Sequence, residues 1–181
     1  MRHERWYAYV YPKNLALHDR RKLAIPRLVK HLEAVYDGEA SFYLDNVDVG
    51  GLILKDASEQ NYLFVLGLLH SRLLDFCFHR ISAPFRGGFR SANRQFIEPL
   101  AIRPVNMANP AEKQIHNNLV ALVNKMLELN RKLKEFSEFE VEKRQALERE
   151  IQHTYEAIDA LVYDLYGLTD VEIKEIESET S

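Results

Sequence analysis

The chain has 181 residues, 46% of them hydrophobic, which is enough for one ordinary domain, or a domain with an appendage, around a substantial core. A single cysteine excludes a disulfide framework, and the sequence contains neither a secretory signal nor the ~20-residue apolar run of a transmembrane helix, so we expect a soluble, cytoplasmic protein with no membrane partner. The net charge of −3 hides an asymmetry: residues 1–105 carry 15 Lys and Arg against 11 Asp and Glu, whereas residues 106–181 carry 9 against 16. This asymmetry suggests an electrostatic partner for the first part and a solvated or partner-facing second part.

Several short runs in the first third of the chain favour strands, because they are rich in aromatic and β-branched residues and end at turn residues. These runs are Trp6–Tyr11, Leu23–Ile25, Ser41–Leu44 and Gly51–Leu54. The segment Leu28–Tyr36 fits either a short helix or a strand, and the Asp37-Gly38 pair that follows favours a turn.

A dense apolar stretch from Tyr62 to Ile81 predicts buried helical structure. Either Asp56 or Ser58 can cap its start, and the stretch is one helix or two helices with a break near His70-Ser71. His70 and His79 could be metal ligands or hydrogen-bonded structural side chains. Cys77 lies inside the apolar run, and we expect it to be buried and to act as a small hydrophobic side chain.

Within the segment His79–Pro104, four arginines precede the first acidic residue, Glu98: Arg80, Arg86, Arg90 and Arg94. A Gly87-Gly88 pair stands between two phenylalanines, and paired glycines let a backbone bend sharply or approach a ligand closely. Arginine offers forked donors that fit phosphates and guanine, and Asn or Gln can pair with adenine. The segment therefore predicts a nucleic-acid contact loop; the alternative is a solvated basic loop whose aromatic residues enter the core.

On this hypothesis, basic residues near the first strands hold phosphates, and planar side chains of the loop read base edges. The predicted phosphate contacts are Lys13, Arg20, Arg21 and Lys22, and the predicted base readers are Arg86, Arg90, Asn93, Arg94 and Gln95. We expect both sets on one face, opposite the acidic C-terminal tail, which would repel DNA. After the loop, Phe96–Ile102 is expected to form the closing strand.

The spacing of apolar residues changes after Pro110 and predicts two helices. The first seam alternates steps of four and three without a slip, and comprises Ile115, Leu119, Leu122, Met126, Leu129, Leu133 and Phe136. The second comprises Leu147, Ile151, Thr154, Ile158, Leu161 and Leu165. Because the link Ser137–Glu140 is short, the helices should be antiparallel. Gly167 is the expected C-cap, and Thr169 should cap a final helix Asp170–Ile176.

These elements predict a mixed α+β fold: an α/β domain over residues 1–105 with short strands and a buried helix, followed by a two-helix coiled-coil hairpin within 111–181. The hairpin either packs on itself or serves as a spacer or docking arm for another chain or domain. The sequence lacks a glycine-rich phosphate loop and the G-x-S-x-G and H-E-x-x-H signatures, so no catalytic, cofactor-binding or metal-binding residue is predicted. Asp170-Val171-Glu172-Ile173-Lys174 resembles a nuclease motif only by coincidence, because it lies on a terminal acidic helix.

The order of these features resembles the C-terminal specificity domain of TaqI-like type IIG restriction–modification enzymes, which is akin to the target-recognition domains of type I specificity subunits. The segments that carry the resemblance span most of the chain: Tyr11–Lys13, Lys22–Pro26, Phe42–Asp45, Tyr62–Leu74, Gly87-Gly88, Phe96–Ile102 and Ile158–Thr169. The sequence departs from the family pattern at His70, where asparagine is usual, and at Pro99–Ile102, where the order of the family's L-x-x-L-P-I segment changes.

The resemblance implies a sequence-specific module that binds double-stranded DNA and has no chemistry of its own. It implies that a methyltransferase or endonuclease region, on the same or a partner chain, carries the reaction and any adenosylmethionine, so no cofactor is expected in this chain. Two rival hypotheses stay open: a protein–protein interaction module that uses the hairpin while the basic loops bind nothing, and a small enzyme whose site the motifs do not reveal.

Overall fold

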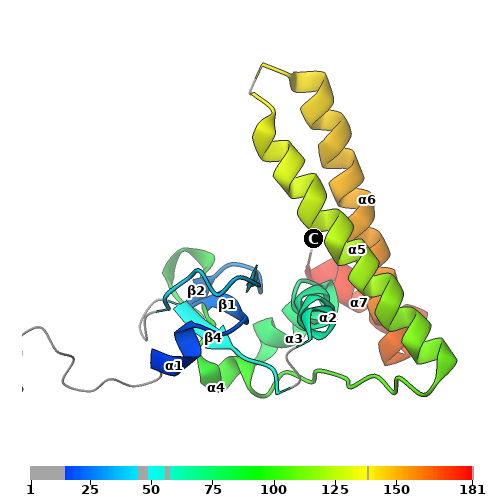
Figure 1. Ribbon diagram of the computed structural model, residues 1–181. Helices are drawn as coiled ribbons and strands as arrows, with labels where there is room; N and C mark the ends of the chain where they lie inside the picture. The colour runs from blue at the N-terminus through cyan, green and yellow to red at the C-terminus, as the bar shows by residue number, and fades with distance from the viewer. Residues whose placement is uncertain (1–14, 45–48, 56–57, 138, 181) are drawn as a thin grey trace, which may run out of the picture.

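A computed structural model describes residues 15–44, 49–55, 58–137 and 139–180, and its fold is α+β, as the sequence predicts (Figure 1). The short strands lie together on one side of the molecule, next to helices α2 and α3, and two long helices project away as a hairpin. The predicted strand Trp6–Tyr11 and the predicted phosphate contact Lys13 lie outside the described residues.

Two small antiparallel sheets form the β region, which follows the short helix α1 (Leu15–His18). In the first sheet, β1 (Lys22–Pro26) lies between β3 (Val35–Asp37) and β4 (Val49–Leu52). In the second, β2 (Leu28–Val29) pairs with β5 (Arg90–Ser91), far apart in the sequence. The ambiguous stretch after Pro26 thus contributes two short strands and no helix.

Two other predicted strands are wrong. Ser41–Leu44 forms no strand, because the Asp37 carboxylate accepts the N–H groups of Ser41 and Phe42 at 2.8 and 2.9 Å and so fixes this backbone in a turn-like path. Phe96–Ile102 forms no strand either: a short helix, α4 (Arg94–Ile97), occupies its start. Pro99 follows and lacks the N–H that a ladder requires.

Helices α2 (Glu59–Leu69) and α3 (Arg72–Ile81) confirm the two-helix alternative for the apolar stretch. The Ser58 hydroxyl caps α2 by accepting the Asn61 N–H, and the Ser71 hydroxyl caps α3 by accepting the Leu74 N–H. Every residue from 62 to 69 is buried. Helix α2 is apolar on all faces because it contacts β1 and β3 as well as α5.

The helices α5 (Pro110–Glu135) and α6 (Val141–Tyr166) form the predicted antiparallel pair. Gly167 ends α6 in the left-handed conformation, with φ of 68°, as expected for a C-cap. Thr169 then starts α7 (Asp170–Glu179) through a reciprocal capping box with Glu172.

The lower part of the hairpin packs against α2. At Gly67, an added Cβ would meet the Val123 side chain at 2.8 Å, so this glycine allows α5 to approach α2 closely. The Phe64 and His116 rings stack with their centroids 4.8 Å apart. Buried side chains of the α/β part and of the helical hairpin form one continuous hydrophobic core. Helix α2 therefore supplies the third surface that a two-helix hairpin needs.

Candidate nucleic-acid interface

The basic loop after α3 is a tight turn held at both ends. The Phe85 N–H donates to the Phe89 carbonyl at 2.7 Å, and the Ser91 N–H donates to the Ala83 carbonyl at 3.0 Å. The turn itself, a 3-10 segment labelled η1 (Arg86–Gly88), contains two glycines with φ of 75° and 77°. Only glycine adopts this backbone conformation readily, so the Gly87-Gly88 pair makes the turn that carries Arg86.

Three of the predicted base readers are exposed: Arg86, Arg94 and Gln95. The Arg86 guanidinium lies 6.0 Å from the ring centroid of Phe85. The Arg94 side chain forms a forked pair with Glu98, with contacts of 3.1 and 3.2 Å. These hydrogen bonds, and then the charge attraction, raise the pKa of Arg94 and lower that of Glu98. Arg94 would therefore have to leave Glu98 before it contacted a base.

The other two predicted base readers, Arg90 and Asn93, are half-buried. The Arg90 guanidinium donates to the Ser82 carbonyl at 2.9 Å and lies 3.4 Å from the Ser82 hydroxyl, which fastens the loop to the end of α3. The Asn93 carbonyl accepts the Phe96 N–H at the start of α4, while its side chain makes no capping bond. Both residues therefore already make hydrogen bonds within the protein, Arg90 through its side chain and Asn93 through its backbone.

The predicted phosphate contacts differ in the same way. Arg20 and Arg21 are exposed, and the Arg21 Nε donates to the Gly38 carbonyl at 3.3 Å. Lys22 is only 1% exposed: its ammonium lies 2.8 Å from the Asp37 carboxylate and donates to the carbonyls of His18 and Arg20. Lys22 cannot reach a phosphate from this position, so the prediction for this residue is corrected. Lys22 is buried against Asp37 because the register of β1 and β3 places the two residues directly opposite each other.

Burial by itself would raise the pKa of Asp37. The hydrogen bond from Lys22 and those from the N–H groups of Phe42 and Ser41, together with the Lys22 charge, act in the opposite direction and lower this pKa to about 2. The pair is therefore a buried structural ion pair that organises the corner of the first sheet.

The acidic C-terminal helix lies closer to the basic segment than expected. Helix α7 packs against α3, and the Arg80 guanidinium contacts Glu175 at 3.0 Å and Glu179 at 2.9 Å. Arg80 also lies 4.2 Å from the centroid of the Phe76 ring. The tail therefore neutralises the first arginine of the segment, which leaves the later arginines as candidates for an external anion.

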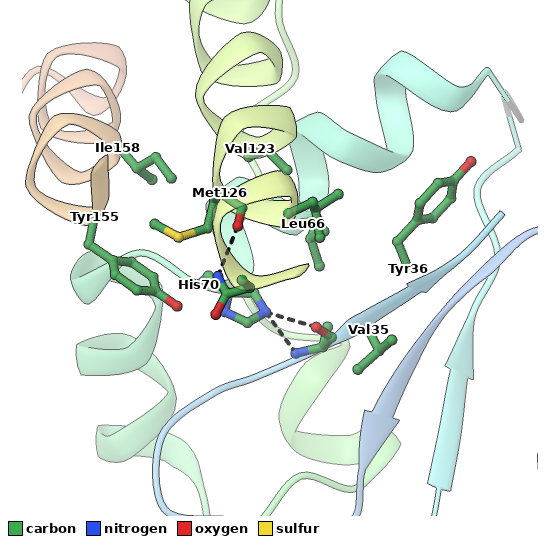
Figure 2. Close-up of a pocket in the computed structure, with 12 residues that line it drawn as sticks. Val35, Tyr36, Leu66, His70, Val123, Met126, Tyr155 and Ile158 are labelled. Carbon is green, nitrogen blue, oxygen red and sulfur yellow. Dashed lines mark hydrogen bonds between the residues drawn. The ribbon is translucent and has the colours of Figure 1, made fainter. Parts of the chain in front are cut away.

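A cavity of about 270 Å³ lies where β3, α2, α5 and α6 meet (Figure 2). Its lining is mainly aliphatic and aromatic, and His70 is the imidazole at its edge. The His70 Nε2 lies 2.8 Å from the Ala34 carbonyl and 3.1 Å from the Ala34 N–H, so the backbone already engages it. His70 is therefore a structural link between α2 and the chain before β3, and the apolar lining is unsuited to a phosphate or a base.

A second feature was missed by the sequence reasoning, which considered His79 but neither His31 nor Asp75. These three side chains form, among the described residues, a group whose donor atoms all lie within 4.8 Å of one another. The available signal was the i,i+4 spacing of Asp75 and His79, which places them on one face of α3. The third member comes from a loop far away in sequence.

A comparison with protein-family models finds no match, and neither does a comparison with curated proteins. None of the described helices has the length and hydropathy needed to cross a bilayer. The candidate interface therefore rests on the exposed arginines and on the resemblance of the sequence alone.

Proposed function

We propose that this chain is a cytoplasmic, sequence-specific module for binding double-stranded DNA, of the kind found as specificity domains in TaqI-like restriction–modification enzymes. It directs a methyltransferase or endonuclease region that lies on the same or a partner chain. Adenosylmethionine belongs to that region, and this chain catalyses no reaction itself. The observation that carries the proposal is the tight basic turn with Arg86 exposed beside Gly87-Gly88.

The surroundings of this turn support the proposal. Its two ends are fixed by backbone hydrogen bonds, and the β2–β5 pairing joins it to the strand that follows Arg27. A preformed turn loses little conformational entropy when it contacts a groove. The guanidinium at its tip can form a bidentate pair with guanine or with a phosphate.

The proposal narrows both sets of predicted DNA contacts. Among the predicted phosphate contacts that the structure describes, Lys22 is buried, and Arg20 and Arg21 are exposed. Arg86 is the strongest base-reading residue, because Arg90 is engaged with Ser82 and Arg94 with Glu98. Gln95 is exposed next to Arg94 and is the candidate for contacting adenine.

The test is a binding assay on duplex DNA with a randomised centre, followed by titration of the selected duplex and an unrelated duplex in increasing salt. Affinity should fall steeply with salt, because each phosphate contact contributes about 0.9 to the slope of log K against log salt. Arg86→Ala should cost about 1–3 kcal/mol on the selected duplex and reduce sequence preference. Arg21→Ala should weaken all duplexes alike and lower the slope by about one.

Arg149→Ala is the matched control, because Arg149 is an exposed arginine on α6. It should bind both duplexes as the unmodified protein does. If Arg86→Ala and Arg21→Ala also behave like the control, this surface does not bind DNA. With adenosylmethionine, magnesium and duplex DNA, the purified chain should neither methylate nor cleave.

The alternative function, a protein–protein interaction module, is favoured by one specific observation. Phe139 at the hairpin tip is 95% exposed, and the neighbouring Val141 is 52% exposed. Exposed large apolar side chains at the end of a projecting arm suit a protein partner. Salt-insensitive or absent DNA binding would make this alternative the preferred function.

A further inference from the structure

We propose that His31, Asp75 and His79 form a binding site for a divalent transition-metal ion of the zinc type. Asp75 and His79 lie on α3, and His31 lies two residues after β2. Imidazole nitrogens with one carboxylate oxygen are a donor set that suits zinc and its neighbours in the transition series.

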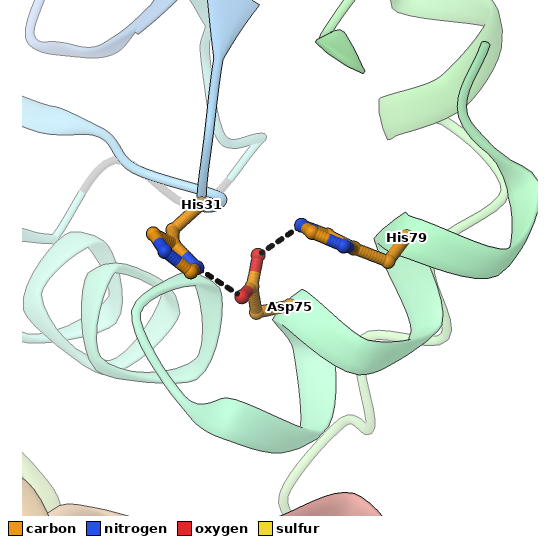
Figure 3. A group of neighbouring side chains, drawn as sticks. All are labelled: His31, Asp75 and His79. Atoms are coloured by element: carbon orange, nitrogen blue, oxygen red, sulfur yellow. Dashed lines mark hydrogen bonds and ion pairs between the residues drawn. The ribbon is translucent and has the colours of Figure 1, made fainter. Parts of the chain in front are cut away.

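The geometry places the three donors around a common point (Figure 3). The His31 Nδ1 lies 2.9 Å from one Asp75 carboxylate oxygen, and the His79 Nε2 lies 3.6 Å from the other. Both rings direct these nitrogens at the carboxylate between them. Ligands bound tetrahedrally to zinc at 2.0–2.1 Å lie about 3.4 Å apart. The three donor atoms here all lie within 4.8 Å of one another, so side-chain shifts on the order of 1 Å would admit an ion.

The backbone around the cluster orients the carboxylate. The Leu32 N–H donates to Asp75 Oδ1 at 2.6 Å, which leaves Oδ2 facing His31. The Lys30 carbonyl lies 2.9 Å from the His79 Nε2. In the imidazole tautomer that carries its proton on Nδ1, the His79 Nε2 can bind a metal, and the carbonyl is then a nearby additional oxygen.

The burial and charges of the surroundings are compatible with a cation. Asp75 is buried, whereas the His31 side chain is 71% exposed, so an ion can reach the site from solvent. The Lys30 ammonium lies over the Phe89 ring at 5.6 Å, and Arg80 is paired with acidic residues of α7. The two nearest cations in sequence are thus directed toward other partners.

A bound ion would join the loop after β2 to α3. Because β2 pairs with β5, the same ion would brace the small sheet from which the basic turn projects. The proposal does not depend on DNA binding, since the ion is held by this chain's own side chains and its binding is measured without DNA.

The experiment uses untagged, chelator-treated protein titrated with Zn²⁺ in a calorimeter and with Co²⁺ by visible absorption. The chain should bind one ion, and Co²⁺ should give the absorption bands of a nitrogen- and oxygen-ligated site. His31→Ala should weaken binding about tenfold or more, and because this side chain is mostly exposed the variant should fold. Asp75→Asn, which keeps an oxygen for the Leu32 N–H, should have the same effect.

His153→Ala is the matched control, because His153 is an exposed histidine whose Nδ1 lies 3.4 Å from the carboxylate of Glu156 and which is not part of the cluster. It should bind Zn²⁺ like the unmodified protein. The proposal is overturned if the unmodified protein binds no Zn²⁺ at high micromolar concentration, or if His31→Ala binds as tightly as His153→Ala. Either result would make the cluster a hydrogen-bonded fastening of the loop to α3.

Discussion

Two buried aspartates, one in the corner of the first sheet and one at the junction of α3 with α6, have pKa values that shift in opposite directions. Asp37 and Asp159 are 2% and 7% exposed, and burial raises the pKa of each. At Asp37 the Lys22 ammonium and several hydrogen bonds dominate, and the pKa falls to about 2. At Asp159 burial dominates over the contacts with Arg72, and the pKa rises to about 6.

The difference lies in how completely each carboxylate is surrounded by donors. Asp37 receives the ammonium at 2.8 Å, two backbone N–H groups and a serine hydroxyl. Asp159 receives one N–H from Arg72 at 2.9 Å, and the Arg72 guanidinium is more distant at 3.4 Å. A buried carboxylate is therefore stable as an anion only where donors replace the water it has lost. The sheet corner meets this condition, and the α3–α6 junction meets it only in part.

The largest expected effect comes from removing the fully surrounded carboxylate. Asp37→Ala leaves the Lys22 ammonium buried without its partner and should lower the free energy of unfolding by about 3–5 kcal/mol. Urea denaturation followed by circular dichroism measures this loss. Asp19→Ala, at an exposed neighbouring position, is the control and should leave stability nearly unchanged. A loss below about 1 kcal/mol for Asp37→Ala would show that Lys22 is solvated.

Removing the charge of the partly satisfied carboxylate, Asp159, should instead stabilise the protein at high pH. Because the pKa of Asp159 is raised in the folded protein, its protonated carboxyl contributes to the free energy of unfolding. This contribution is complete below the unfolded pKa of about 3.9 and is lost as pH rises through about 6. Asp159→Asn should therefore raise the free energy of unfolding at pH 8, by up to about 3 kcal/mol, with little change at pH 4. Asp164→Asn, an exposed site on the same helix, should show no such difference. A destabilised Asp159→Asn protein at pH 8 would contradict the raised pKa.

Acid titration sharpens the comparison at Asp37. Its lowered pKa gives a stabilising contribution that is complete above the unfolded pKa and is lost as pH falls through about 2. We expect about 2 kcal/mol to be lost between pH 5 and pH 2, measured as the difference between the unmodified protein and Asp37→Asn. A difference that stays constant over this range would mean that Asp37 titrates normally in the folded protein.

The smallest effect is expected at the exposed Arg94–Glu98 pair. Its side chains are 87% and 63% exposed, and such pairs add little to stability because solvent screens them. Arg94→Ala should leave the urea midpoint unchanged within error, although the pKa of Glu98 should return toward its ordinary value. A clear drop in the midpoint would show that this pair organises α4.

The sequence predicted the helical elements better than the strands, for a physical reason. Capping residues and 3.6-residue periodicity act within a few positions, and the caps at Ser58, Gly167 and Thr169 are found where the sequence places a candidate cap. The strands depend on partners far along the chain. Ser41–Leu44 and Phe96–Ile102 have strand-like composition but pair with no strand within the described part of the chain, and composition alone predicted them wrongly.

For the candidate interface, the sequence identified a basic turn but could not separate the exposed arginines from the occupied ones. The two glycines that make the turn were recognisable, because positive φ is a local property. That Arg90 is engaged by Ser82, and Arg94 by Glu98, depends on how the loop folds back on α3 and α4. The salt titration with Arg86→Ala addresses the exposed arginine at the tip of the turn.

The sequence by itself determined the α+β composition, the antiparallel hairpin, and the turn of paired glycines, all of which follow from short-range spacing and backbone preference. Only the tertiary structure decided that α2 forms the third surface of the hairpin and that Lys22 is buried against Asp37. It also decided that His31 meets Asp75 and His79. These contacts join positions far apart in the chain, and their energies depend on burial and on donor geometry, which exist only once the chain is packed.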